Sequence, residues 1–553
     1  MGALVVFGLA AFITGRYILF YKIRNTIQHE LGNLRQQGIH ISYESLQVFP
    51  WDGKIEAHEL TVRVRKDSVG TDSTDRGLVA YLPYITLEGF DLIPFLKEKT
   101  ISLHKIHSYE TYVTYPVNST LFEHDSSRRR KIEVKNIAVR QVNFPDIDFY
   151  LTDQHTPDTI AHILTDVKMQ DLFLAKQLDS LTWQKGEVDI SNFAMNYKKE
   201  NYGISFRRIV LGISNKSITM DSLRVKPLVN REAFMRLAGK QTTYMEATIP
   251  RLQIRSIDWY TFPTATLQID HLDVRFLASM YRDKRLPFMQ RSDRPLPSHL
   301  LHRIPIQLKI DTISISDSFV QYEEMPESGD STGLVYFEKL NARITNAHNN
   351  KRLAVDTRMH ASAKFMGAGD LDAHFTFPYD TSQIYRVAGT LKNMPLTRLN
   401  NMLGSAAKAK VESGVMRNLE FNFTYNDARS EGGVELNYEN LKILTLRENK
   451  KNEQSVSRIK TLLLNAFIIR KNMDEDVKDD KRKGAIGFDR DTKRSVFNYW
   501  WKSVLSGIKS AYNLDKLPLN ANNGDDKKIK DKKKKRPLKD AWSKIFSRDK
   551  KKE

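Results

Sequence analysis

Apolar and polar residues alternate along most of this chain. From Gly38 to Val387 the alternation has a period of two, which is typical of strands with one apolar and one polar face. The clearest run places isoleucine or leucine at every second position from Ile304 to Ile310. Helical periodicity is scarce in this part of the chain. We therefore predict a mainly β body over residues 38–387.

A longer pattern recurs within the alternation: apolar, any, apolar, any, any, apolar, any, apolar. Seven copies occur, and the first two apolar positions of each are our candidates for residues that line an apolar groove: Ile132, Val134, Val188, Ile190, Ile204, Phe206, Ile218, Met220, Leu252, Ile254, Leu267, Ile269, Leu308 and Ile310. Strict alternation would turn the second half of each copy to the opposite face. Each copy therefore implies either a β-bulge that restores the face or a break between strands.

The copies are spaced too irregularly for a short-period solenoid or a propeller. They fit an elongated antiparallel sheet, built from successive hairpins and curled by repeated bulges. Few amphipathic helices are available to cover its apolar face, so either a second sheet or a ligand must lie there. A β-sandwich with a dry core is one alternative. The other is a lipid-lined groove, in which each buried CH₂ of an acyl chain contributes ~0.8 kcal/mol.

The amino-terminal segment is apolar. Ala3 to Tyr21 is a 19-residue stretch interrupted by Arg16, close to the ~20 residues that cross a bilayer as a helix. We predict a transmembrane anchor at residues 1–21, with a buried soluble helix as the alternative, and an amphipathic capping helix at residues 22–37. Lys22 and Arg24 follow the span, and this charge count favours a cytoplasmic body.

The positive charge is concentrated at the carboxyl end. Residues 527–553 hold 14 basic and 4 acidic residues, which gives +10 of the formal +20. We predict a disordered basic tail at residues 515–553, whose favoured partner is the anionic headgroups of a membrane. Nucleic acid and a purely solubilising role are the alternatives. The chain has no cysteine, which excludes disulfides and thiolate chemistry.

A second amphipathic helix is predicted at residues 494–514, after a charged connecting region at 448–493 that includes a short helix. Its apolar stripe carries aromatic residues with interspersed lysines, which suits a bilayer interface. The candidates for membrane contact are Phe497, Trp500, Trp501, Leu505 and Ile508. The alternative is a helix docked on the end of the sheet, because core-facing helices carry the same stripe.

Two regions resemble the bacterial AsmA-like family. The first comprises Gly38 to Val64 and Ile85 to Tyr115, with a glycine, a strand, an aromatic-proline turn and further strands. The second, at residues 388–447, begins with Gly389 to Leu403, where Pro395 opens a short helix. It continues with alternating strand residues and a predicted turn at Gly432-Gly433.

This resemblance implies a single-pass protein of the bacterial inner membrane, with a periplasmic β-groove related to bridge-like lipid-transfer proteins. It further implies a role in phospholipid traffic and outer-membrane integrity.

The sequence contains no recognised catalytic motif: no P-loop, no dinucleotide-binding fingerprint, no nucleophile elbow and no H-E-x-x-H helix. Gly367-Ala368-Gly369 is too short to cradle a phosphate and indicates a tight turn or bulge. His104 and His107 have no third ligand at a recognisable spacing. We predict no catalytic residues, no metal and no cofactor, and a non-catalytic protein that binds or transfers phospholipid. The alternative is a structural scaffold or assembly factor for envelope membrane proteins, with a closed β-core and no lipid cargo.

Overall fold

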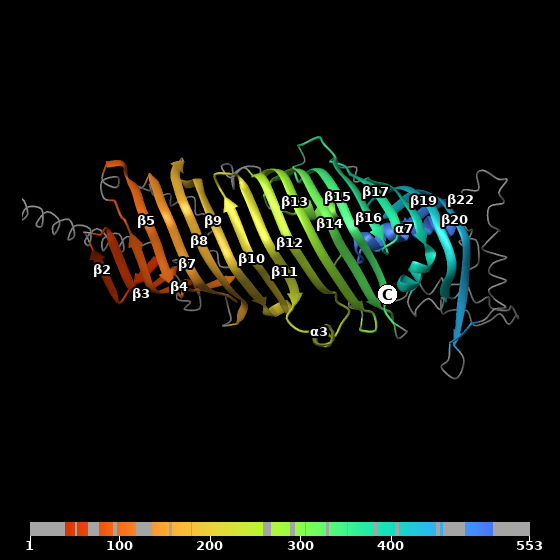
Figure 1. Cartoon of the computed structure of the whole chain (residues 1–553), viewed down its shortest axis with the longest axis horizontal. Helices are drawn as coiled ribbons and strands as arrows, with labels where there is room; N and C mark the ends of the chain where they lie inside the picture. The colour runs from red at the N-terminus through yellow and green to blue at the C-terminus, as the bar shows by residue number, and fades with distance from the viewer. Residues whose placement is uncertain are drawn as a thin grey trace, which may run out of the picture. The chain divides into compact units, whose positions relative to one another are not determined.

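A computed structural model of the chain (Figure 1) describes residues 39–511, with gaps at 50–51, 65–76, 92–96, 118–134, 154–157, 178–179, 258–266, 288–292, 305, 328–330, 351, 380–383, 404–408, 449–453 and 457–481. Strands make up most of the described chain, which confirms the mainly β class. The predicted anchor, capping helix and basic tail lie outside the described residues. No helix among the described residues is both long and apolar enough to cross a membrane.

The chain divides into two compact units: residues 1–228 with 249–262 (unit 1), and residues 229–248 with 263–553 (unit 2). Unit 1 contains β1 (Ile39–Ser42), β2 (Ser45–Phe49), β3 (Lys54–Val64), β4 (Leu78–Glu88), β5 (Thr100–Tyr109), β6 (Tyr112–Val117), β7 (Asn136–Asp153), β8 (Thr159–Gln177), β9 (Ser180–Tyr197), the 3₁₀ turn η2 (Lys198–Glu200), β10 (Tyr202–Gly212) and β11 (Ser217–Pro227). The residues of β12 (Tyr244–Ile257) are divided between the two units.

Unit 2 contains α3 (Arg231–Ala238), β13 (Leu267–Asp283), α4 (Pro297–His302), β14 (Leu308–Met325), β15 (Gly333–His348), β16 (Thr357–Phe365), β17 (Gly369–Phe377), β18 (Tyr385–Pro395), η3 (Leu396–Leu399), α5 (Asn400–Leu403), β19 (Ala409–Tyr425), β20 (Arg429–Glu448), β21 (Gln454–Val456), β22 (Arg482–Asp489) and α7 (Val496–Ala511). Its consecutive strands from β14 to β20 pair antiparallel, and β22 pairs with β20.

In unit 1, successive hairpins place β7, β8, β9, β10 and β11 side by side in chain order (Figure 1). Before them, β5 and β6 both pair antiparallel with β4 and parallel with β7. In unit 2, β13 and β14 are also parallel. The prediction of an antiparallel sheet is therefore wrong at these pairings, and the sheet is mixed. The chain between β13 and β14 contains α4, and such a crossover allows a strand to return in the same direction.

Bulges lie within continuous strands, and the one near Asn192 of β9 falls inside the predicted copy that begins at Val188. Between β7 and β8 the register shifts at Phe144/Ile147, and between β8 and β9 it shifts at Leu164/Asp166. In both places the extra residue belongs to the neighbouring strand, β7 or β9, and not to β8. Asp146 in β7 and Asn192 in β9 adopt left-handed backbone with φ of 54° and 53°, as one form of β-bulge requires.

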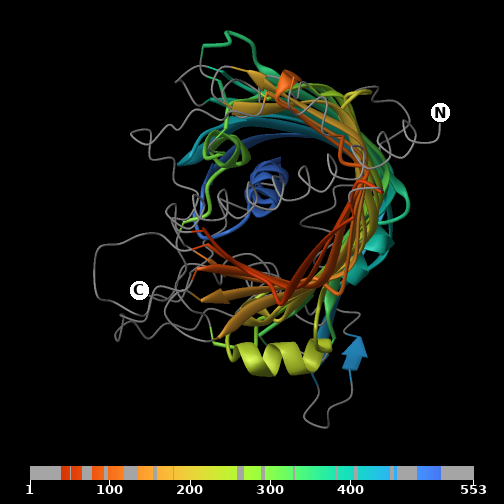
Figure 2. The same cartoon turned by 90° about the vertical axis from the view of Figure 1, so that its left-hand side faces the viewer.

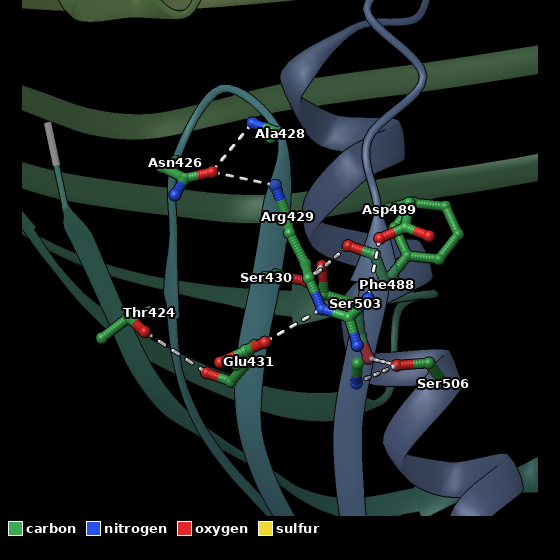
Figure 3. Close-up of polar contacts among 11 residues, drawn as sticks. Thr424, Asn426, Ala428, Arg429, Ser430, Glu431, Phe488, Asp489, Ser503 and Ser506 are labelled. Atoms are coloured by element: carbon green, nitrogen blue, oxygen red, sulfur yellow. Dashed lines mark hydrogen bonds and ion pairs between the residues drawn. The ribbon is translucent and has the colours of Figure 1, made fainter.

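In unit 2, α7 lies on the concave side of the strands and packs against β20 and β22 (Figure 2). The buried residues that form this core include Phe365, Tyr385, Val387, Leu419, Phe423, Tyr425, Val434, Leu436, Ile486, Tyr499 and Val504. Ser430 of β20 and Ser503 of α7, both fully buried, are joined by a 2.7 Å hydrogen bond between their hydroxyls (Figure 3). A helix, rather than a second sheet or a ligand, therefore fills this part of the molecule.

Two local predictions for unit 2 are wrong. Gly432 and Gly433 lie inside β20, and the hairpin turn falls earlier, where the Asn426 side-chain oxygen accepts from the N–H groups of Ala428 and Arg429 (Figure 3). Gly432 is needed there because a Cβ would lie 2.1 Å from the Asn422 carbonyl oxygen. The charged connecting region also contains β22, which pairs with β20 and was not predicted. The short helix after Pro395 is present as η3 and α5.

Candidate functional site

Three apolar rows cross the strands of unit 1. Each row consists of residues paired in register on neighbouring strands, and paired residues project to the same face of a sheet. The first is Ile106, Val142, Met169, Val188, Leu211, Ile218; the second is Phe144, Val167, Ile190, Ile209, Met220; the third is Phe149, Ile163, Met195, Ile204, Val225. Five of the predicted groove residues are members: Val188, Ile190, Ile204, Ile218 and Met220.

The rows share one face because of the bulges. On β8, which is regular here, Ile163 and Val167 are four residues apart and therefore project to the same side. On β9, the corresponding residues Ile190 and Met195 are five apart, so strict alternation would place them on opposite sides. The extra residue at the bulge near Asn192 returns both side chains to the same face of the sheet. Between these rows the rings of Phe193 and Phe206 stack with centroids 4.4 Å apart.

The opposite face of the same strands is polar. One row on it contains Asn143, Lys168 and Asp189 in register. The guanidinium of Arg208 donates to the Asp189 carboxylate at 2.9 Å, and this contact raises the pKa of the arginine. The sheet of unit 1 is thus amphipathic, with a solvated face and an apolar face.

The apolar face of unit 1 differs from that of unit 2 in its cover. Val142 is 6% exposed, but most other members of the rows keep intermediate exposure. The described residues of unit 1 include no helix comparable to α7. The arrangement offers a half-buried apolar surface that crosses five neighbouring strands.

The remaining groove candidates are placed as follows. Leu252 and Ile254 are half-buried on β12. In unit 2, Ile269 and Ile310 face each other across the parallel pair β13–β14 and are only 4% and 7% exposed, and Leu267 and Leu308 form the neighbouring pair. Phe206 is 9% exposed in unit 1. Ile132 and Val134 lie outside the described residues.

The predicted membrane-contact residues lie on α7, and the structure matches the docked-helix alternative for most of them. Leu505 is 6% exposed, and the Trp500 ring lies 4.7 Å from that of Phe375. Trp501 is half-buried, and Ile508 packs against the core. Phe497 differs, since it is 69% exposed. In this structure Leu505, Trp500 and Ile508 pack against the core of unit 2, as the docked-helix alternative expects, because a core-facing helix carries the same apolar stripe.

Two buried polar residues of β5 make contacts within the fold. His107 interacts through Nδ1 with the backbone oxygen of Asn143 at 3.0 Å. Ser108 is fully buried and donates to the Tyr84 carbonyl at 2.9 Å. These contacts join β5 to β7 and β4 and satisfy the two buried polar groups. No protein-family model matches the chain, and the search of curated proteins gave no match either.

Proposed function

We propose that the apolar rows of unit 1 bind the acyl chains of a phospholipid, and that the protein carries or transfers lipid without catalysis. The observation that supports this is the continuity of the rows: apolar residues follow one another in register over five strands and stay half-buried. The AsmA-like resemblance favours the same function. On this proposal the protein belongs to the bacterial inner membrane, with its body in the periplasm and a role in outer-membrane integrity.

The dimensions of the rows suit an acyl chain. Five strands at ~4.8 Å spacing span about 19 Å, somewhat more than the ~15 Å of one leaflet of a hydrocarbon core. At ~0.8 kcal/mol per buried CH₂, a chain lying along a row would gain substantial free energy. The polar face would remain in water, so the lipid could be held outside a bilayer. The basic tail would supply affinity for anionic headgroups.

Scaffolding of envelope membrane proteins is the second candidate. It is favoured by unit 2, where α7 and the strands form a filled core of buried aromatic and aliphatic residues. A unit with its apolar face closed in this way has no room for cargo there. The two candidate functions therefore make different predictions for unit 1: it binds lipid if the protein is a carrier, and it binds none if the protein is a scaffold.

Ile209 and Val210 provide a test with a matched control. They are adjacent on β10, but Ile209 belongs to the second apolar row, whereas Val210 lies opposite Asp189 on the polar face. We expect the full chain, purified gently in mild detergent, to retain phospholipid detectable by native mass spectrometry and lipid extraction. Ile209→Asn should remove most of it, and Val210→Asn should leave it unchanged.

Circular dichroism of both variants would establish that each is folded. Lipid lost equally from both variants, or a wild-type chain that carries none, would reject the acyl-chain site and favour the scaffold.

A further inference from the structure

We propose that His360, Asp372 and His374 form a binding site for a divalent transition-metal ion on the polar face of β16 and β17. One ligand atom from each of the three residues lies within 4.8 Å of the others. Two imidazoles and one carboxylate form a donor set that zinc and related ions prefer. The sequence predicts no metal in this chain, and this site corrects that prediction if it binds an ion.

The strands hold the three side chains in place. β16 and β17 form a hairpin in which His360 is paired directly with His374. Asp372 precedes His374 by two positions, so both project to the same face. The intervening Ala373 is 6% exposed and belongs to the opposite, inward face. The ligands therefore come from a rigid part of the fold.

The contacts converge on the carboxylate. His360 Nε2 lies 2.7 Å from Asp372 Oδ2, and His374 Nε2 lies 3.3 Å from Asp372 Oδ1. The two rings stack with centroids 4.2 Å apart and planes 4° from parallel.

The site is open to ions and to water. The side chains of His360, Asp372 and His374 are 52%, 45% and 63% exposed. An ion held by these three residues would keep coordination positions for water or for a ligand from another molecule. Calcium and magnesium prefer all-oxygen sites, so the two imidazoles select for borderline ions such as zinc.

The charged neighbours limit the affinity. Arg343 of β15 is paired with His360, and its positive charge opposes that of a cation. On the other side, β18 places the uncharged Ala388 opposite His374. Further along the hairpin, Lys364 and Asp370 neutralise each other in an ion pair. We expect binding weaker than at a closed four-ligand zinc site.

Zinc titration of the full chain by isothermal calorimetry tests the site. We expect one Zn²⁺ per chain, with affinity lowered roughly tenfold or more by His374→Ala and by Asp372→Asn. The second variant keeps the size of the side chain and one of its two acceptor oxygens, and it removes the negative charge. His271→Ala, at an exposed histidine of β13 in the same unit, is the matched control.

A second readout identifies the ligands directly. Electron paramagnetic resonance of the chain with one equivalent of Cu²⁺ should show nitrogen coordination that is reduced in His374→Ala and retained in His271→Ala. Zinc binding that is absent from the wild-type chain, or equal in all four proteins, would overturn the proposal.

Discussion

Gly484 of β22 and Gly507 of α7 face each other at backbone contact distance. A Cβ on Gly484 would lie 2.0 Å from the carbonyl oxygen of Gly507. Next to this contact, the N–H groups of Ala485 and Gly487 donate to the hydroxyls of Ser510 and Ser506 at 3.1 and 3.2 Å. The helix thus satisfies donors of β22 that are directed away from β20, and an edge strand with satisfied donors is protected from pairing with other chains.

Gly484→Val should undock α7. The new side chain would meet backbone that cannot move aside, so we expect the free energy of unfolding to fall by about 1–3 kcal/mol. Urea denaturation of the full chain, followed by tryptophan fluorescence, would measure the loss. Gly433→Ala is the matched control, because a Cβ there would make only an ordinary 3.7 Å contact with the Gly484 oxygen. Equal midpoints for both variants would contradict the packing argument.

The buried pair of Ser430 and Ser503 should show coupled energetics. Ser503 also donates to the carbonyl of Tyr499 at 2.8 Å, which leaves Ser430 as the donor to Ser503. Ser430→Ala leaves the Ser503 hydroxyl without its donor, and Ser503→Ala leaves the Ser430 hydroxyl with only the longer 3.4 Å contact to the Phe488 carbonyl. Loss of a partner by a buried hydroxyl costs about 1–3 kcal/mol. We expect the double variant to lose less stability than the sum of the two single losses, measured by the same urea denaturation. Strict additivity would show that the hydroxyls do not interact.

The strands and their faces could be predicted from the sequence because alternation is a local signal. Five copies, those that begin at Val188, Ile204, Ile218, Leu267 and Leu308, lie within continuous strands. Asn192, Ser222 and Ser256, each the second residue of the two-residue interval in its copy, have left-handed backbone. Two further features could not be predicted from the local pattern of residues. The parallel pairing of β13 with β14 depends on where a crossover returns, and α7 has the same apolar stripe whether it meets a sheet or a bilayer.

The proposed metal ligands were missed for a similar reason. His360 and His374 are 14 residues apart, and only the register of the β16–β17 hairpin places them opposite each other. A signal was nevertheless present in the sequence. Gly367 and Gly369 indicated a tight turn, and pairing the strands symmetrically around it would have brought Asp372 and both histidines to one face.

Alkaline conditions should destabilise unit 2 through Tyr499. Burial raises the pKa of Tyr499 to about 12 from its usual value of 10.0. The folded state therefore keeps a proton that the unfolded state loses between pH 10 and 12. The contribution of Tyr499 to the free energy of unfolding is fully present below pH 10. It falls as the pH rises through this window, by at most about 1.4 kcal/mol per pH unit.

Tyr499→Phe should accordingly flatten part of the decline in urea midpoint between pH 10 and 12. Tyr379→Phe is the control, since the Tyr379 side chain is 41% exposed. An unchanged slope in Tyr499→Phe would mean that the tyrosine ionises without unfolding.

The left-handed residue of β9 should determine whether the apolar rows of unit 1 stay on one face. Asn192 has a φ of 53°, and its amide donates to the Asp166 carboxylate at 2.6 Å. A β-branched residue in this conformation costs about 1–2 kcal/mol, so Asn192→Val should lower the thermal unfolding temperature. Asn192→Gly removes the backbone strain, and it should be more stable than the valine variant although it loses the same hydrogen bond. Ala194→Val, at an exposed position on the same strand, should have little effect.

If the valine and glycine variants melted at the same temperature, the bulge would not require left-handed backbone at this position. Ile190 and Met195 would then have to share a face for another reason.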